Sequence, residues 1–394
     1  MQKKLIKNMT ASVKSHLQTI RFDRNELSGA FGDIGTDMPL IVGMILASRL
    51  DSASVLIMFG AMQILTGFTY RIPMPVQPLK AMAAIVIAQN LTGKILYGGG
   101  LAIGITMLLL TVTGLIDWLG RVIPKSVIRG IQFGLGLKLA SIALKNYVGA
   151  DSIPGYWLAA IGFVITILLI GNRRYPPAIF VIILGIVYAF FFKLDAATIV
   201  QSVGFSLPNI YMPTLPDVFA GFLILALPQI PLSLGNSIFA TRQMTQDLFP
   251  DRLITVRKIS LTYSLINIIN PFLSGIPTCH GSGGIAGHYA FGARTGGSVV
   301  IYGLIYLVLG FFFSGGFEKV IQVFPLPILG VILLFEGLTL MLLLRDVSES
   351  KQDFSIAILV GLMASGLPYG FVIGLIVGTL LAYLPRTRLA GLAK

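Results

Sequence analysis

Long apolar runs, separated by short polar connections, occupy almost the whole chain. Most of them have roughly the 20 residues that a helix needs to cross the hydrocarbon core of a membrane. The pattern predicts an all-α polytopic membrane protein with fourteen transmembrane segments in two sets of seven. The segments are expected near residues 27–47, 53–70, 76–90, 98–118, 126–145, 155–171 and 176–192, and near 216–237, 255–273, 281–293, 297–314, 322–343, 354–367 and 369–385.

Two of these runs, 76–90 and 281–293, are too short to cross a bilayer as helices, and they are the third and tenth segments. Pro73 and Pro75 precede the first run, and Pro78 lies near its start. Pro277 and a glycine-rich stretch from Gly281 to Gly287 open the second. Such backbone is tolerated at membrane depth only where it lines a cavity or is buried in protein. We therefore expect a broken helix at each place, with an extended segment followed by a half-helix.

The two sets of seven share local sequence at a nearly constant offset. Ile72-Pro73 precedes the first short run as Ile276-Pro277 precedes the second, and Val122-Ile123-Pro124 opens the fifth run as Val323-Phe324-Pro325 opens the twelfth. Because seven is an odd number, the two halves must have opposite orientations in the membrane. The sequence predicts an inverted repeat, a common arrangement in secondary transporters.

Composition and charge agree with this class. Hydrophobic residues make up 55% of the chain and charged residues 11%, with a mean hydropathy of +0.86. The net charge of +13 does not indicate a nucleic-acid partner, because the basic residues are spread over short loops. Excess Lys and Arg mark cytoplasmic loops, so both termini are expected on the cytoplasmic side of the membrane. This orientation places most Lys and Arg residues in the cytoplasm. The exceptions are Arg49, Lys94, Lys145, Lys193 and Lys319, which would lie outside, and Lys80 and Lys138, which would lie within segments.

Residues 1–24 are basic, with apolar residues three or four apart, which indicates an amphipathic helix on the cytoplasmic membrane surface or a disordered basic tail. No cleavable signal peptide is predicted. The single cysteine, Cys279, excludes a disulfide framework. With His280 and His288 it provides too few ligands for zinc and no orienting partner for a nucleophile. We therefore expect no metal, no cofactor and no enzyme activity.

The two half-helices provide the candidate binding site. Each helix N-terminus carries roughly half a positive charge and unpaired N–H groups, so two facing N-termini would bind an anion. Neutral donors are expected from Thr36 and, in the eighth segment, from Ser233, Asn236 and Ser237, where proline and glycine should again break the helix. The predicted substrate-binding residues are Thr36, Gln77, Pro78, Leu79, Lys80, Ser233, Cys279, His280, Gly281, Ser282, Gly283 and Gly284.

Charged residues within the segments have two interpretations. Lys80 either faces the anion or forms an ion pair with Asp33 or Asp37, which are four residues apart and share a helix face. The two aspartates could instead handle a proton, and Asp37 could be a structural helix cap, a role that suits Glu26 better. Glu336 could pair with Lys138 at a comparable depth in the repeat-related helix.

The chain resembles the molybdate transporter family, which is related to the SulP sulfate permeases. The residues that carry the resemblance are 75–81 (PVQPLKA), 277–284 (PTCHGSGG), 291–294 (FGAR) and 26–36 (ELSGAFGDIGT), with Ser282 where the family usually has alanine. The resemblance implies a SulP-like fold with a core domain at 25–119 and 216–316 and a gate domain at 120–192 and 317–394. The connection 193–215 would be extracytoplasmic.

The resemblance also implies uptake of a tetrahedral oxyanion. The leading hypothesis is a secondary transporter in the inner membrane that imports molybdate by alternating access. Tungstate and sulfate are alternative substrates, and an oxyanion channel of the same fold is an alternative mechanism. A coupling proton, carried for example by His280, and a homodimer in contact with membrane lipid are compatible with this hypothesis.

Overall fold

Helices form nearly all of the regular structure in this computed structural model, which describes residues 20–170, 177–192 and 203–384. Within these residues, six helices are long and apolar enough to cross a membrane, or seven if the bent pair α17–α18 is counted as one span. This is the architecture of an integral membrane protein. Several other apolar helices are shorter, so the fourteen-segment inverted repeat stays a prediction. The N-terminal segment up to residue 19 lies outside the described residues.

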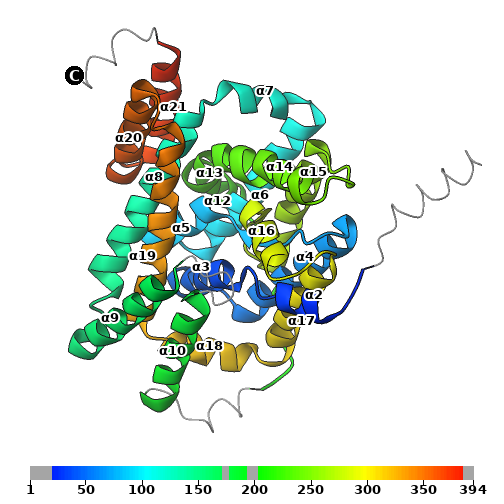
Figure 1. Ribbon diagram of the computed structural model, residues 1–394, viewed down its shortest axis with the longest axis vertical. Coiled ribbons are helices and arrows are strands. Elements are labelled where there is room, and N and C mark those ends of the chain that lie inside the picture. The colour runs from blue at the N-terminus through cyan, green and yellow to red at the C-terminus, as the bar shows by residue number, and fades with distance from the viewer. Residues whose placement is uncertain (1–19, 171–176, 193–202, 385–394) are drawn as a thin grey trace, which may run out of the picture.

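The larger group of helices occupies the centre and right of Figure 1. Its helices from different halves of the sequence pack against each other, α4 against α17 and α6 against α15. Close packing depends on small residues: a Cβ on Gly60 would lie 2.6 Å from the backbone oxygen of Gly303. The group comprises α2 (Arg24–Gly29), α3 (Ile34–Ser48), α4 (Ser52–Tyr70), α5 (Lys80–Gln89), α6 (Gly93–Val112), α12 (Leu215–Gly221), α13 (Leu227–Leu232), α14 (Thr241–Leu248), α15 (Val256–Ile269), α16 (Ser282–Ala290) and α17 (Gly297–Phe312).

The smaller group lies along the left side of Figure 1, where α8 packs against α19 and α20. The outer helices α9 and α10 expose apolar side chains, among them Leu168 at 76% and Phe191 at 74%, as expected for lipid contact. Two further helices, α7 (Leu115–Val122) and α18 (Ser314–Val323), connect the groups. The smaller group comprises α8 (Lys125–Ile142), α9 (Ser152–Leu169), α10 (Pro177–Phe192), α19 (Leu326–Leu342), α20 (Lys351–Gly366) and α21 (Gly370–Tyr383).

The first and eighth segments differ from the prediction, which gave a continuous first segment and a broken eighth segment. The eighth segment is not broken at residues 228–237, because the chain stays helical from Leu215 to Leu248. Two π-helical stretches, Phe222–Ala226 and Ser233–Ala240, flank α13 and widen the helix around Pro231, which accommodates the missing proline N–H. The first segment, by contrast, is interrupted between α2 and α3.

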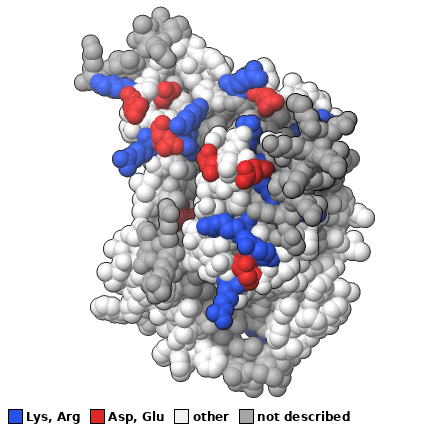
Figure 2. Space-filling model, turned by 45° about the vertical axis from the view of Figure 1, so that its right-hand side comes forward, with Lys and Arg blue, Asp and Glu red and all other residues white. Residues whose placement is uncertain are grey.

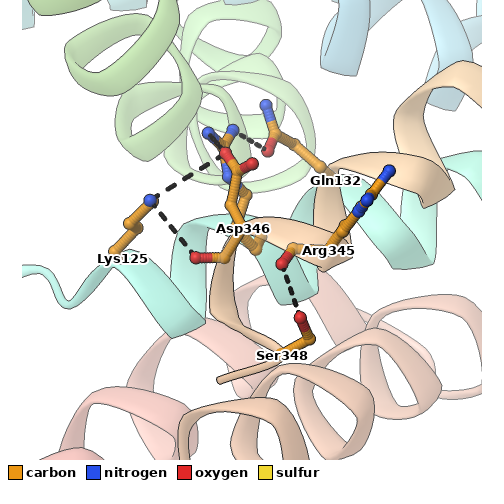
Figure 3. A network of polar contacts seen from close by, with 6 residues as sticks. Lys125, Gln132, Arg345, Asp346 and Ser348 are labelled. Carbon is orange, nitrogen blue, oxygen red and sulfur yellow. Dashed lines mark hydrogen bonds and ion pairs between the residues drawn. The ribbon is translucent and has the colours of Figure 1, made fainter. Parts of the chain in front are cut away.

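Charged side chains are unevenly distributed over the surface. Figure 2 shows them gathered over the upper and central parts of one face, whereas the lowest part of that view is largely uncharged. A polar network lies at the end of the smaller group, where Arg129 and Lys125 of α8 both pair with Asp346 (Figure 3). Arg129 also donates to Gln132 Oε1 at 2.8 Å. This network links the start of α8 to the short 3-10 helix Leu343–Val347 that follows α19.

Candidate anion-binding site

A two-stranded sheet holds the starts of the two half-helices together. Strand β1 (Val76–Pro78) pairs antiparallel with β2 (Thr278–His280), so that Gln77 lies opposite Cys279 and Pro78 opposite Thr278. The Leu79 N–H donates to the Pro277 oxygen at 3.1 Å. Helix α5 begins directly after β1 and α16 directly after β2. The predicted order of extended segment and half-helix is confirmed at both positions.

The same side-chain device holds each strand. Gln63 of α4 donates to the Val76 oxygen at 2.7 Å and accepts from the Val76 N–H at 2.9 Å. Asn267 of α15 makes the matching pair of bonds to Thr278, at 2.6 and 3.0 Å. Both amide side chains are completely buried. Two buried amides thus replace the strand neighbours that such a short sheet lacks.

A small polar cavity of about 20 Å³ lies beside the sheet, between the two groups of helices. This volume accommodates about one water molecule. The larger group provides side chains from β1, α5, α13, β2 and the π-helical stretch after α13, and the smaller group provides them from α8 and α19. The lining residues are Gln77, Lys80, Gln132, Leu135, Gln229, Leu232, Asn236, Ser237, Cys279 and Leu340.

The N-terminus of α5 is capped by a side chain. Gln229 Oε1 accepts from the N–H groups of Ala81 at 2.9 Å and Met82 at 3.2 Å. Gln229 in turn donates to Ser233 Oγ at 3.2 Å, and Ser233 Oγ lies 2.7 Å from the Tyr263 hydroxyl. Ser233 therefore supports the cap and does not line the cavity, although the sequence predicted an anion contact.

Among the described residues, no side chain accepts a hydrogen bond from the first N–H groups of α16, and its N-cap residue is Gly281. Its glycines allow close approach: a Cβ on Gly281 would overlap Gln77, and one on Gly284 would lie 2.6 Å from Pro75 Cγ. At Gly283 a Cβ would meet no atom within 4 Å. Ser282 between them is half-buried. The start of α16 thus combines uncapped N–H groups with open space at Gly283.

The two aspartates of the first segment are buried and hydrogen-bonded. Asp33, at the N-cap position of α3, accepts from Gln77 Nε2 through both carboxylate oxygens, at 2.8 and 2.7 Å. Asp37 accepts from the Tyr302 hydroxyl at 3.2 Å. Glu26 is a structural cap, because its carboxylate accepts from the N–H groups of Arg294 and Thr295, just before α17, and of Ser298 in its first turn.

The ion pair of Lys80 differs from the predicted alternatives. Lys80 Nζ lies 3.8 Å from Glu336 Oε2 on α19, whereas Asp33 and Asp37 use the hydrogen bonds described above. The predicted pairing of Glu336 with Lys138 was therefore wrong. Lys138 Nζ instead lies 5.1 Å from the centre of the Phe371 ring. The pairing of repeat-related positions failed because α5 inserts between the two helix groups and brings Lys80 to Glu336.

Of the predicted substrate-binding residues, only Gln77, Lys80 and Cys279 line the polar cavity. His280 and Thr36 have other surroundings. The His280 ring is buried, with Nε2 2.7 Å from Thr262 Oγ1 and its centre 5.2 Å from that of the Tyr70 ring. Side chains alternate along a strand, so His280 faces away from Cys279. Thr36 lines a separate cavity of about 250 Å³ that Glu336 also lines.

Four amide residues with clear roles were not among the predicted site residues. They cap, clamp or line the site, and each is the polar exception in an apolar stretch, which is the signal that could have identified it. They are Gln63, Gln132, Gln229 and Asn267. In the described part of the chain, no group of three His, Cys, Asp or Glu side chains could hold a metal ion.

Sequence comparison identifies the relatives of the chain. A family profile described as "Molybdate transporter of MFS superfamily" matches residues 25–139 and 221–340. Molybdate transporter 2 of Arabidopsis thaliana is 33% identical over 407 residues, which cover 91% of this chain and 87% of the relative. Molybdate transporter 1 of the same plant is 32% identical over 416 residues, which cover 94% and 90%.

Solved structures share the fold at low sequence identity. The transmembrane domain of the cyanobacterium bicarbonate transporter BicA is similar with a TM-score of 0.67 and 16% identity, over 93% of this chain and 98% of that one. The murine Slc26a9 anion transporter in the inward-facing state has a TM-score of 0.68 and 13% identity, over 94% and 69%. On the strength of the profile match and the Arabidopsis relatives, the chain belongs to the molybdate transporter family.

Proposed function

We propose that this chain is a secondary transporter that imports a tetrahedral oxyanion, with molybdate as the first candidate. The observation that carries the proposal is the pairing of the strands that precede the two half-helices, beside a polar cavity that Lys80 lines between two groups of helices. The names of the Arabidopsis relatives favour molybdate over tungstate and sulfate. The sequence-derived alternative is an oxyanion channel of the same fold.

A molybdate dianion loses its hydration on entering the site, and donors must replace that water. The two helix ends offer roughly one positive charge together, and the Lys80 ammonium offers a second. Asn236 and Ser237 provide neutral donors around the cavity, whereas the Gln77 amide nitrogen already donates to Asp33. The uncapped N–H groups of α16 complete the set, since an oxyanion only accepts hydrogen bonds.

Transport would proceed by alternating access. The core domain, residues 25–119 and 216–316, would move against the gate domain, residues 120–192 and 317–394, within fourteen segments arranged as an inverted repeat. The matching clamps of Gln63 and Asn267 support a repeat, and the polar cavity draws residues from both proposed domains. His280 faces away from this cavity, so Asp33, bonded to Gln77, is the better candidate to carry a coupling proton.

The decisive experiment uses the purified full-length protein in detergent and in sealed vesicles. Binding of molybdate, tungstate and sulfate is measured by calorimetry, and uptake of labelled molybdate is followed against its concentration gradient. We expect the tightest binding for molybdate and accumulation inside the vesicles when a proton gradient is imposed. Flux that stops at equal concentrations under every imposed gradient would indicate a channel.

We also propose that the protein lies in the inner membrane, with both termini in the cytoplasm, as a homodimer. Cysteines introduced in the 203–214 connection should react with an impermeant reagent from outside. Cysteines at 249–254 should react only after the membrane is opened. The reverse labelling pattern would contradict both the orientation and the segment count, whereas the dimer is checked by the mass of the purified protein in detergent.

A further inference from the structure

An ion pair bridges the two groups of helices beside the candidate site. Lys80 belongs to α5 and Glu336 to α19, and their side chains are 28% and 17% exposed. Lys80 lines the polar cavity of about 20 Å³, whereas Glu336 lines the cavity of about 250 Å³ together with Thr36, Thr166 and Thr339. The ion pair therefore lies between two cavities and joins α5 to the other helix group.

Lys80 has Glu336 as its ion-pair partner, while the nearby aspartates have other bonds. Asp33 accepts from Gln77, and Asp37 from Tyr302. An oxyanion that bound Lys80 would meet the Glu336 carboxylate on the same ammonium group. Two like charges a few ångströms apart in a partly buried site repel each other strongly. The Lys80 ammonium group therefore binds either anion more weakly when the other is present.

We propose that Glu336 is an internal competitor of the transported anion, because its carboxylate and the oxyanion are alternative partners of Lys80. The inference rests on the proposed function, since it requires an oxyanion at Lys80. When the oxyanion takes over the ammonium group, the link between α5 and α19 is released. Filling the site would thereby loosen the contact between the two helix groups, which must separate for the site to change sides. Glu336 is thus a positioning residue that couples loading to movement.

Removing the competing charge tests the proposal directly. Glu336→Gln keeps the size of the side chain and removes its charge, so the Kd for molybdate, measured by calorimetry on the full chain, should fall about tenfold. Thr339→Val is the matched control, because Thr339 lies on the same helix and lines the same cavity but carries no charge. Its Kd should equal that of the parent. A change of less than twofold for Glu336→Gln would overturn the proposal.

A second measurement separates competition from a purely structural role. Glu336→Ala leaves space for a small carboxylate beside Lys80, so acetate should compete with molybdate in this variant and much less in the parent. Equal inhibition of both proteins by acetate would also overturn the proposal. A parent protein that binds no molybdate, tungstate or sulfate would contradict the proposed function itself. If the parent binds molybdate and the Glu336 variants bind it with the same Kd, only the role of Glu336 is contradicted.

Discussion

The half-helices α5 and α16 occupy equivalent places after paired strands, yet their N-termini differ. Gln229 caps α5, whose first turn carries Lys80. In the part of the chain that the structure describes, no side chain caps α16, whose first turn reads Ser282-Gly283-Gly284. A capped helix end has fewer N–H groups for a ligand, so α5 would contribute mainly charge and α16 mainly backbone donors. The comparison teaches that two helix N-termini with the same backbone arrangement can make different contributions to the binding of one anion.

The largest effect on molybdate binding is expected at the N-terminus of α5, which carries Lys80. Lys80→Ala removes the positive side chain at the cavity, and we expect molybdate to bind about a hundredfold more weakly, which corresponds to about 2.7 kcal/mol. Calorimetry on the purified variant measures the loss, and a thermal melt checks that the protein is folded. Unchanged binding at the same pH would assign Lys80 a structural role through Glu336 alone.

A smaller loss of molybdate affinity is expected at the N-terminus of α16, where Gly283 faces open space. Gly283→Val places a branched side chain where a Cβ meets no atom within 4 Å, so the fold should tolerate it while the anion loses space and N–H access. We expect molybdate binding to weaken about tenfold. Gly204→Val is the matched control, because Gly204 is equally unobstructed but lies in the connection before α12. If both variants bind like the parent, the anion does not use the start of α16.

The cap itself can be broken without changing the charge. Gln229→Leu leaves the N–H groups of Ala81 and Met82 without their acceptor, which should lower stability by about 2 kcal/mol. Gln229→Glu keeps an acceptor but adds a negative charge at the cavity, so it should preserve the melting temperature better and weaken molybdate binding. Thermal melts and calorimetry on the two variants separate the roles. Equal melting temperatures for parent and Gln229→Leu would show that the cap is dispensable.

The sequence predicted the features that depend on local pattern. Prolines and glycines located both half-helices to within a few residues, and Gln77 and Cys279 of the two motifs lie opposite each other beside the candidate cavity. Features that depend on which helices meet were predicted poorly. Lys80 pairs with Glu336 on a distant helix, and Ser233 contacts Gln229 and Tyr263. The break predicted in the eighth segment was wrong because π-helical turns absorb proline in a way that composition does not reveal.

The smallest effect on molybdate binding is expected at Ser233. The sequence predicted that Ser233 contacts the anion, whereas in the structure its hydroxyl is hydrogen-bonded to Gln229, the cap of α5. Ser233→Ala removes the hydroxyl that accepts from Gln229 and contacts Tyr263, so stability should fall by about 1 kcal/mol. Because Ser233 does not line the cavity, the Kd for molybdate should change less than twofold. Tyr263→Phe, which removes the other partner of the same hydroxyl, should produce a similar loss of stability. A large loss of affinity in Ser233→Ala with an unchanged melting temperature would indicate that Ser233 contacts the anion directly. The proposed difference between the N-termini of α5 and α16 would then be wrong.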